Sequence, residues 1–211
     1  MLVLIAWLIT CALLFGVAAP LNAQTPPPAS TVFQNVRIFD GTGSQLSGPL
    51  HVLVRGNRIE RISSTPIASD RRADTVLIDS GGRTLMPGLI DMHWHTMMVR
   101  PTVAQMLTGD VGHLNFMAGA EAADTLMRGF TTIRDLGGPA FGLKRAIDDG
   151  TVIGPRIYPS GAIISVTSGH GDFRQPFEVP RVLGAPQSRG EQVGAAMIAD
   201  SPDEVRVRVR E

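Results

Sequence analysis

The sequence predicts an α/β protein in which a parallel sheet follows a region of short β-strands. From Leu89 onward, segments with strand character alternate with segments rich in helix formers, a pattern typical of parallel sheets with crossover helices. Between residues 31 and 88, short runs of strand-forming residues are instead separated by turn residues. Apolar residues make up 44% of the chain, an ordinary share for a globular protein. We therefore expect both regions to contain sequence that is meant to be buried.

The first 23 residues form a separate unit. The stretch up to Ala19 is almost wholly apolar, Thr10 is its only clearly polar residue, and small residues suitable for cleavage follow. We predict a signal peptide over residues 1–23, with export to the periplasm or the extracellular space, and a proline-rich linker over residues 24–30. An uncleaved membrane anchor is the alternative, because the apolar run approaches the roughly 18 residues that such an anchor needs.

Cysteine content and charge narrow the possible partners. Cys11 is the only cysteine and would leave with the signal peptide, so the mature chain would have neither disulfides nor thiolate metal ligands. Nineteen basic and nineteen acidic residues cancel. We expect no nucleic-acid partner, and a membrane partner only if the N-terminal segment stays attached.

Residues 31–88 are predicted to form an N-terminal β-strand region. The Gly56-Asn57 pair accepts positive φ, so it predicts a tight hairpin between its flanking strands. Strands are expected at Val32–Phe39, His51–Arg55, Arg58–Ile62 and Thr75–Asp79.

Residues 89–211 are predicted to alternate between strands and helices. After the strand that starts at Leu89, strands are expected at Phe130–Arg134 and Ile157–Ile164, and helices at Ala118–Met127 and Phe141–Asp149. The segment from Thr96 to Phe116, which contains His113, is expected to connect the first strand to its helix, either as a lid or as apolar filling. At the end of the chain, Ser201 with Glu204 suggests a capping box. We expect a helix there, although the Val/Arg alternation over residues 205–210 has the period of a strand.

The stretch Met86-Pro-Gly-Leu-Ile-Asp-Met-His-Trp-His95 carries the strongest functional signal. Side chains two residues apart in a strand project to the same side, so His93 and His95 can share one metal ion. Neutral imidazole is a good zinc ligand, and a catalytic zinc site needs about three protein ligands. The alternative is a chance pair of histidines on a half-buried strand.

Several motifs together resemble the amidohydrolase superfamily of metal-dependent hydrolases. The first is the Pro-Gly-Leu-Ile-Asp-x-His-x-His pattern that ends at His95. Gly129–Gly138 is similar to the family's second strand, and Gly154–Gly161 with Thr167–Asp172 is similar to the third, most closely in the imidazolonepropionase-like and prolidase-like subgroup. The resemblance implies a TIM-type (β/α)8 barrel, here incomplete with its first three strands in residues 89–211, preceded by a small β-sandwich portion.

The resemblance also implies an activity and a site. It suggests hydrolysis of carbon–nitrogen bonds in a small amide or dipeptide by attack of a metal-bound water. His93 and His95 would be ligands of a divalent metal, with zinc expected, and the complete enzyme would hold one or two ions. Asp135 and His170 follow strands and would contact substrate or support a ligand, with a salt-bridged or ordinary loop role as the alternative. No catalytic residue is identifiable, because the family's aspartate from the last strand has no counterpart.

Length sets the remaining expectations. A (β/α)8 barrel takes about 250 residues, and this chain has 211. We therefore expect the N-terminal fragment of a hydrolase. The alternatives are an inactive truncated chain with at most weak metal binding, and a membrane-anchored domain without enzymatic activity. Because strands from the family's C-terminus usually complete the sandwich, we also expect an uncovered apolar face that favours association, with a homo-oligomer as one form of it.

Overall fold

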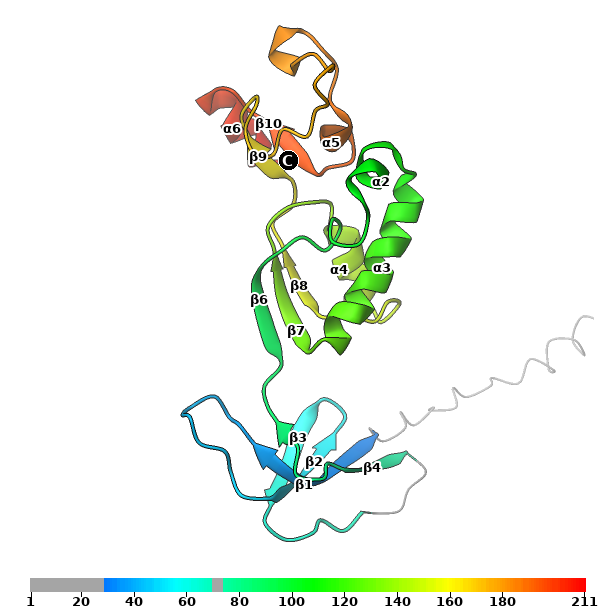
Figure 1. Cartoon of the computed structure of the whole chain (residues 1–211), viewed down its shortest axis with the longest axis vertical. Coiled ribbons are helices and arrows are strands. Elements are labelled where there is room, and N and C mark those ends of the chain that lie inside the picture. The colour runs from blue at the N-terminus through cyan, green and yellow to red at the C-terminus, as the bar shows by residue number, and fades with distance from the viewer. Residues whose placement is uncertain (1–28, 70–73) are drawn as a thin grey trace, which may run out of the picture. The chain divides into compact units, whose positions relative to one another are not determined.

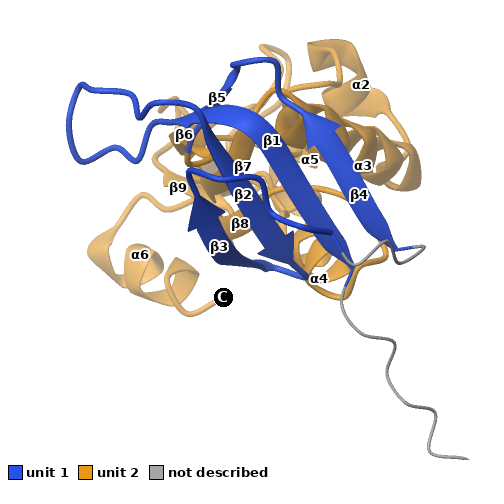
Figure 2. Ribbon diagram, turned by 90° about the horizontal axis from the view of Figure 1, so that it is seen from below, with its two compact units in different colours: residues 1–86 blue, residues 87–211 orange. Residues whose placement is uncertain are grey.

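The computed structural model describes residues 29–69 and 74–211 (Figure 1). The chain divides into two compact units, residues 1–86 and 87–211, which Figure 2 colours separately. The sequence analysis placed the corresponding boundary at residue 88. The predicted signal peptide and most of the predicted linker lie outside the described residues, so export stays a prediction. In the part of the chain that the structure describes, no helix is both long and apolar enough to cross a membrane.

The first unit contains one five-stranded sheet. Its order is β3-β2-β1-β4, and β5 pairs with the far end of β1. β1 runs antiparallel to β2 and parallel to β4 and β5. The predicted hairpin is confirmed, since Arg55 pairs with Arg58 and Gly56 has φ of 58°. The strands are β1 (Ser30–Ile38), β2 (Leu50–Arg55), β3 (Arg58–Ser63), β4 (Thr75–Asp79) and β5 (Thr84–Leu85).

The predicted sandwich portion is thus a single hydrogen-bonded sheet in the described residues. Val32, Leu53 and Ile67 pack together as its buried cluster. Other apolar side chains of β3 and β4 remain in contact with solvent, as expected for this region; they are Ile59, Ile62, Val76, Leu77 and Ile78.

The second unit begins with three parallel strands and two helices, which confirms the predicted α/β alternation. The strand order is β6 (Leu89–Trp94), β7 (Phe130–Asp135), β8 (Arg156–Pro159), and both pairings are parallel. α3 (Val111–Met127) contacts β7, and α4 (Phe141–Asp148) contacts β8. Figure 1 shows both helices beside this sheet. Ile133 of β7 and Ile157 of β8 are buried, as are Ala118 and Ala122 of α3.

The predicted start of α3 at residue 118 was wrong. The helix begins seven residues earlier, after its N-cap Asp110, which accepts a hydrogen bond from the backbone N–H of His113. His113 therefore lies in the first turn of a helix and not in a connecting segment. A further short helix, α2 (Val103–Thr108), precedes it. Gly112 and Asn115 are poor helix formers, and the burial of Leu114 and Ala118 offsets their propensity.

The predicted third strand is interrupted. β8 ends at Pro159, Gly161 adopts a φ of 86°, and a new strand, β9 (Ile163–Ser165), pairs in parallel with β10 (Ala196–Ile198). A 3₁₀ turn (Arg181–Leu183) and α5 (Arg189–Gln192) lie between β9 and β10.

The expected C-terminal helix is confirmed as α6 (Pro202–Arg208). The Ser201 side chain accepts a hydrogen bond from the backbone N–H of Glu204. The local cap therefore prevails over the strand-like Val/Arg alternation.

Candidate functional site

The two predicted metal-ligand histidines lie together at the carboxyl end of β6. Their ring centroids are 5.4 Å apart, with an interplanar angle of 75°. His93 is exposed and His95 is half-buried. The backbone N–H of His93 donates to Asp91 Oδ1 at 2.9 Å. The strand end thus presents two imidazoles side by side.

A backbone carbonyl sets the orientation of the His95 ring. His95 Nδ1 lies 3.2 Å from the carbonyl oxygen of Gly137. A carbonyl oxygen can only accept, so this hydrogen bond requires the proton on Nδ1. In the neutral ring, Nε2 then keeps a free lone pair. Metal-binding histidines in proteins are commonly held in this way, with the second ring nitrogen donating to a carbonyl or carboxylate.

Asp135 anchors both chain segments around His95. Its side chain is fully buried at the end of β7. One oxygen, Oδ2, accepts from the backbone N–H of Thr96 at 2.7 Å and from Thr96 Oγ1 at 2.5 Å. The other, Oδ1, accepts from the backbone N–H of Gly137 at 3.1 Å. One carboxylate therefore holds the residue after His95 and the residue whose carbonyl contacts the His95 ring.

Thr96 and Gly137 were not identified by the sequence analysis. A Cβ atom at Gly137 would lie 2.2 Å from Ile163 Cγ1 and 3.4 Å from His95 Cε1. The absence of a side chain is therefore a packing requirement at this point. Only their closeness in sequence to predicted site residues could have identified them, since Thr96 directly follows His95 and Gly137 lies two residues after Asp135.

His170 lies in a turn after β9 and is exposed. Among the described residues, no hydrogen bond or ring contact joins it to the histidine pair. Its turn includes Ser168, whose φ is 60° and whose backbone N–H donates to Asp172 Oδ2 at 2.7 Å. The structure therefore joins Asp135 by hydrogen bonds to the segments around His95, whereas His170 makes no such bond to the histidine pair among the described residues.

Two carboxylates hold the turn that carries His170. The Asp172 side chain is buried beside Arg174, with 2.5 Å between Oδ2 and Nη2. Hydrogen bonding to Arg174 lowers the pKa of Asp172 below its ordinary value, against the opposing effect of burial. Asp200 accepts from the backbone N–H and Oγ1 of Thr167, at 2.7 and 2.6 Å. These two bonds lower the pKa of Asp200 as well.

The chemistry of the histidine pair suits part of a zinc site. Two neutral imidazoles at adjacent positions match two of the roughly three protein ligands of a catalytic zinc. Within residues 29–69 and 74–211, no cluster of three or more His, Cys, Asp or Glu side chains is arranged to hold a metal ion. The pair is therefore a fitting but partial ligand set.

Comparison with known proteins identifies the family. Residues 84–211 match the sequence profile of the amidohydrolase family. The chain belongs to the amidohydrolase family. It is also 38% identical over 137 residues to the ochratoxinase of Aspergillus niger, a match that covers 60% of this chain and 28% of that protein.

Solved structures of similar proteins share the fold of this chain. A prolidase crystallised with N-methylphosphonate-L-proline is 34% identical, with a TM-score of 0.71 over 86% of this chain and 43% of that one. A Xaa-Pro dipeptidase with bound methionine is 27% identical, with a TM-score of 0.67 over 86% of this chain and 44% of that one. This amidohydrolase chain therefore spans less than half the length of these relatives.

Proposed function

We propose that this chain supplies the first three strands of a TIM-type barrel in a metal-dependent hydrolase of carbon–nitrogen bonds. The parallel order β6-β7-β8 with its helices supports this assignment, as does the similarity to a prolidase and an ochratoxinase. We propose a small amide or dipeptide as the substrate class, because prolidase and Xaa-Pro dipeptidase structures are among the similar proteins.

The observation that carries the proposal is the hydrogen bond between His95 Nδ1 and the Gly137 carbonyl. It leaves Nε2 of His95 available next to the His93 ring. His93 and His95 would hold the divalent ion, for which we propose zinc. Such an ion, when bound, lowers the pKa of water and polarises a carbonyl, which makes amide hydrolysis feasible near neutral pH.

The other residues of the site would act by position. Asp135 keeps Thr96 and Gly137 in place, and through Gly137 it fixes which nitrogen of His95 carries the proton. His170, exposed on its turn, is proposed to contact substrate. The residue that moves the proton to the leaving amine is not identifiable in this chain.

A second candidate is a chain that binds metal weakly without hydrolysing amides. The two-histidine ligand set favours it, because about three protein ligands are usual in a catalytic site. Hydrolysis and metal binding measured on the same preparation separate the two candidates.

The test uses the 211-residue chain with zinc and its single-alanine variants at His93, His95, His51 and His113. Zinc binding is measured by competition with a coloured chelator, and amide hydrolysis by amine release from a dipeptide panel. We expect weak zinc binding that His93→Ala and His95→Ala abolish. His51→Ala and His113→Ala serve as matched controls and should retain it. Equal binding by all four variants would overturn the ligand assignment, and binding without amine release would support the second candidate.

A further inference from the structure

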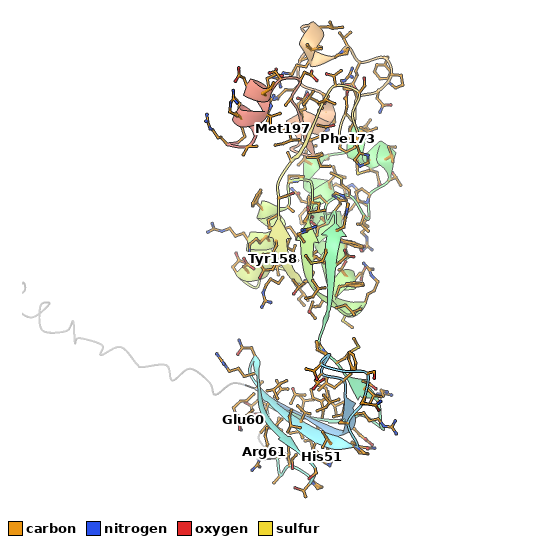
Figure 3. The ribbon with its side chains drawn as sticks, turned by 90° about the vertical axis from the view of Figure 1, so that its left-hand side faces the viewer. His51, Glu60, Arg61, Tyr158, Phe173 and Met197 are labelled. Carbon is orange, nitrogen blue, oxygen red and sulfur yellow. The ribbon has the colours of Figure 1, made fainter. Side chains whose placement is uncertain are left out.

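The second unit contains an apolar cavity of about 340 Å³. Its walls come from α2, the first turns of α3, α5 and the segments that follow β6, β7 and β9. The residues used below are Met97, Met98, Met106, Leu114, Phe173 and Val193. Figure 3 shows Phe173 near the end of the unit that carries β9 and β10, away from Tyr158 on β8.

The size and lining of this cavity are those of a ligand pocket. Protein interiors leave few voids larger than a water molecule. An apolar cavity of about 150 Å³ already accepts benzene, and ligand pockets start at about 300 Å³. The cavity is therefore large enough for a ring-sized apolar group, and its lining gives water few hydrogen-bonding partners.

The cavity lining follows the histidine pair along the chain and packs beside Gly138. A Cβ atom at Gly138 would lie 3.4 Å from Met98 Cε and 3.6 Å from Met97 Cβ, both on cavity-lining residues. One residue earlier, a Cβ atom at Gly137 would lie 3.4 Å from His95 Cε1. The backbone N–H of Met98 also donates to the His95 carbonyl at 2.9 Å. The lining therefore begins two residues after His95 along the chain, at Met97.

The charged residue in the lining favours a neutral occupant. Arg174 lines the cavity, but its Nε donates to Asp172 Oδ1 at 2.8 Å and its Nη1 to the Glu178 carbonyl at 2.9 Å. The guanidinium is thus already paired, and what remains for an occupant is mostly apolar surface. The other polar side chains in the lining, Asn115 and Gln175, are uncharged, so among the described lining residues no unpaired cation is offered to a carboxylate or phosphate.

We propose that this cavity receives an apolar, ring-sized side chain of the amide substrate. Held there, the side chain would direct the adjoining amide toward the His93 and His95 rings. This inference rests on the proposed function for the identity of the occupant as substrate. The binding itself requires no metal, so it can be tested separately.

The test follows methionine methyl signals of the 211-residue chain by NMR, without metal, as N-acetylphenylalaninamide is added. Met97, Met98 and Met106 line the cavity, whereas Met127 and Met197 do not; Met197 is labelled in Figure 3. We expect the first three methyls to shift and the last two to stay in place. N-acetylglycinamide, which lacks the side chain, should produce no shift. Equal shifts with both amides, or shifts confined to Met127 and Met197, would overturn the proposal.

Two variants sharpen the result. Val193→Phe fills the cavity and should weaken binding of the phenylalanine amide at least tenfold, while Val207→Phe on the exposed face of α6 should leave it unchanged. Met106→Ala enlarges the cavity and should shift preference toward the bulkier naphthylalanine amide, which keeps the proposal testable if Val193→Phe does not fold. Unchanged affinity in both cavity variants contradicts the proposal. Retained binding in a His93→Ala, His95→Ala double variant would show that the cavity functions even where the proposed metal chemistry fails.

Discussion

Two segments at strand ends of the second unit carry predicted site residues, and they are held by different means. The first, here called the β6–β7 end, consists of residues 93–96 and 135–137. It is fixed by one buried carboxylate that accepts three hydrogen bonds. The second, the β9 turn, consists of residues 166–174 and depends on Asp172 with Arg174 and on Asp200 with Thr167. Its histidine, His170, is exposed.

The difference concerns how firmly each histidine is positioned. Losing the partner of a buried donor costs the full desolvation of that donor, so the β6–β7 end has a strong energetic reason to stay in one arrangement. The hydrogen bonds between Asp200 and Thr167 in the β9 turn are exposed, and such contacts contribute less and respond to pH and salt. His95 is therefore suited to a fixed ligand role, and His170 to a contact that adjusts to its partner.

The largest effect is expected from Asp135→Asn. The NH2 group of the asparagine cannot accept a hydrogen bond. At least one of the donors that now bind Asp135, which belong to Thr96 and Gly137, would therefore lose its partner in a buried place. We expect unit 2 to lose about 3 kcal/mol of unfolding free energy, and zinc binding to weaken because Gly137 no longer holds His95. Urea unfolding followed by Trp94 fluorescence measures the loss, with Trp7→Phe in every protein so that one tryptophan reports.

Asp149→Asn is the matched control for that substitution. Asp149 is exposed and accepts from the backbone N–H of Thr151 at 3.1 Å. It should change unfolding by a few tenths of a kcal/mol at most, as surface substitutions usually do. If Asp135→Asn behaved like this control, the contrast between the two segments would disappear.

Gly137→Ala should have the next largest effect. The new methyl group would have to displace Ile163, and overpacking of this kind costs about 1–3 kcal/mol. Because the Gly137 carbonyl would move, we also expect long-range proton–nitrogen NMR spectra to show a smaller share of the Nδ1–H form of His95. Gly142→Ala in α4 is the control, since nothing lies within 4 Å of its added methyl group, and alanine is the better helix former. An unaltered His95 tautomer in Gly137→Ala would contradict the proposed role of the carbonyl.

The smallest effect is expected from acidification of the β9 turn. The folded-state pKa values of Asp172 and Asp200 are lowered by Arg174 and Thr167 respectively. Their stabilising contribution is therefore complete above the ordinary carboxyl pKa of about 4 and is lost as pH falls through the lowered folded values. We expect amide hydrogen exchange at Ser168, measured relative to its intrinsic rate, to lose protection several-fold across that range.

Asp172→Asn provides the comparison for the acid titration. It should reduce protection of Ser168 already at neutral pH and flatten the remaining acid dependence, since Ser168 donates directly to Asp172. If the wild type had already lost this protection by the time the pH is lowered to 6, another group would be titrating, and this explanation would be wrong.

Local sequence was sufficient for the hairpin between β2 and β3 and for α6. Gly56 predicted the hairpin because a glycine accepts the positive φ that the turn uses. Ser201 with Glu204 predicted α6 against the strand-like alternation because a capped first turn forms from neighbouring residues alone. The parallel α/β order and the placement of His93 and His95 on one strand end followed from periodicity in the same way.

Other features depended on contacts between segments distant in sequence. The early start of α3 required Leu114 and Ala118 to find buried partners, which outweigh the weak propensity of Gly112 and Asn115. Only packing brings together the segments that form the hydrogen bonds to Asp135, the contact of Gly137 with His95, and the cavity.

Sequence by itself determined which side chains could bind a metal, because residue type and spacing are local properties. Tertiary structure decided which of them lie together and which ring nitrogen of His95 faces the Gly137 carbonyl, because hydrogen bonds across strand ends exist only once the strands have paired.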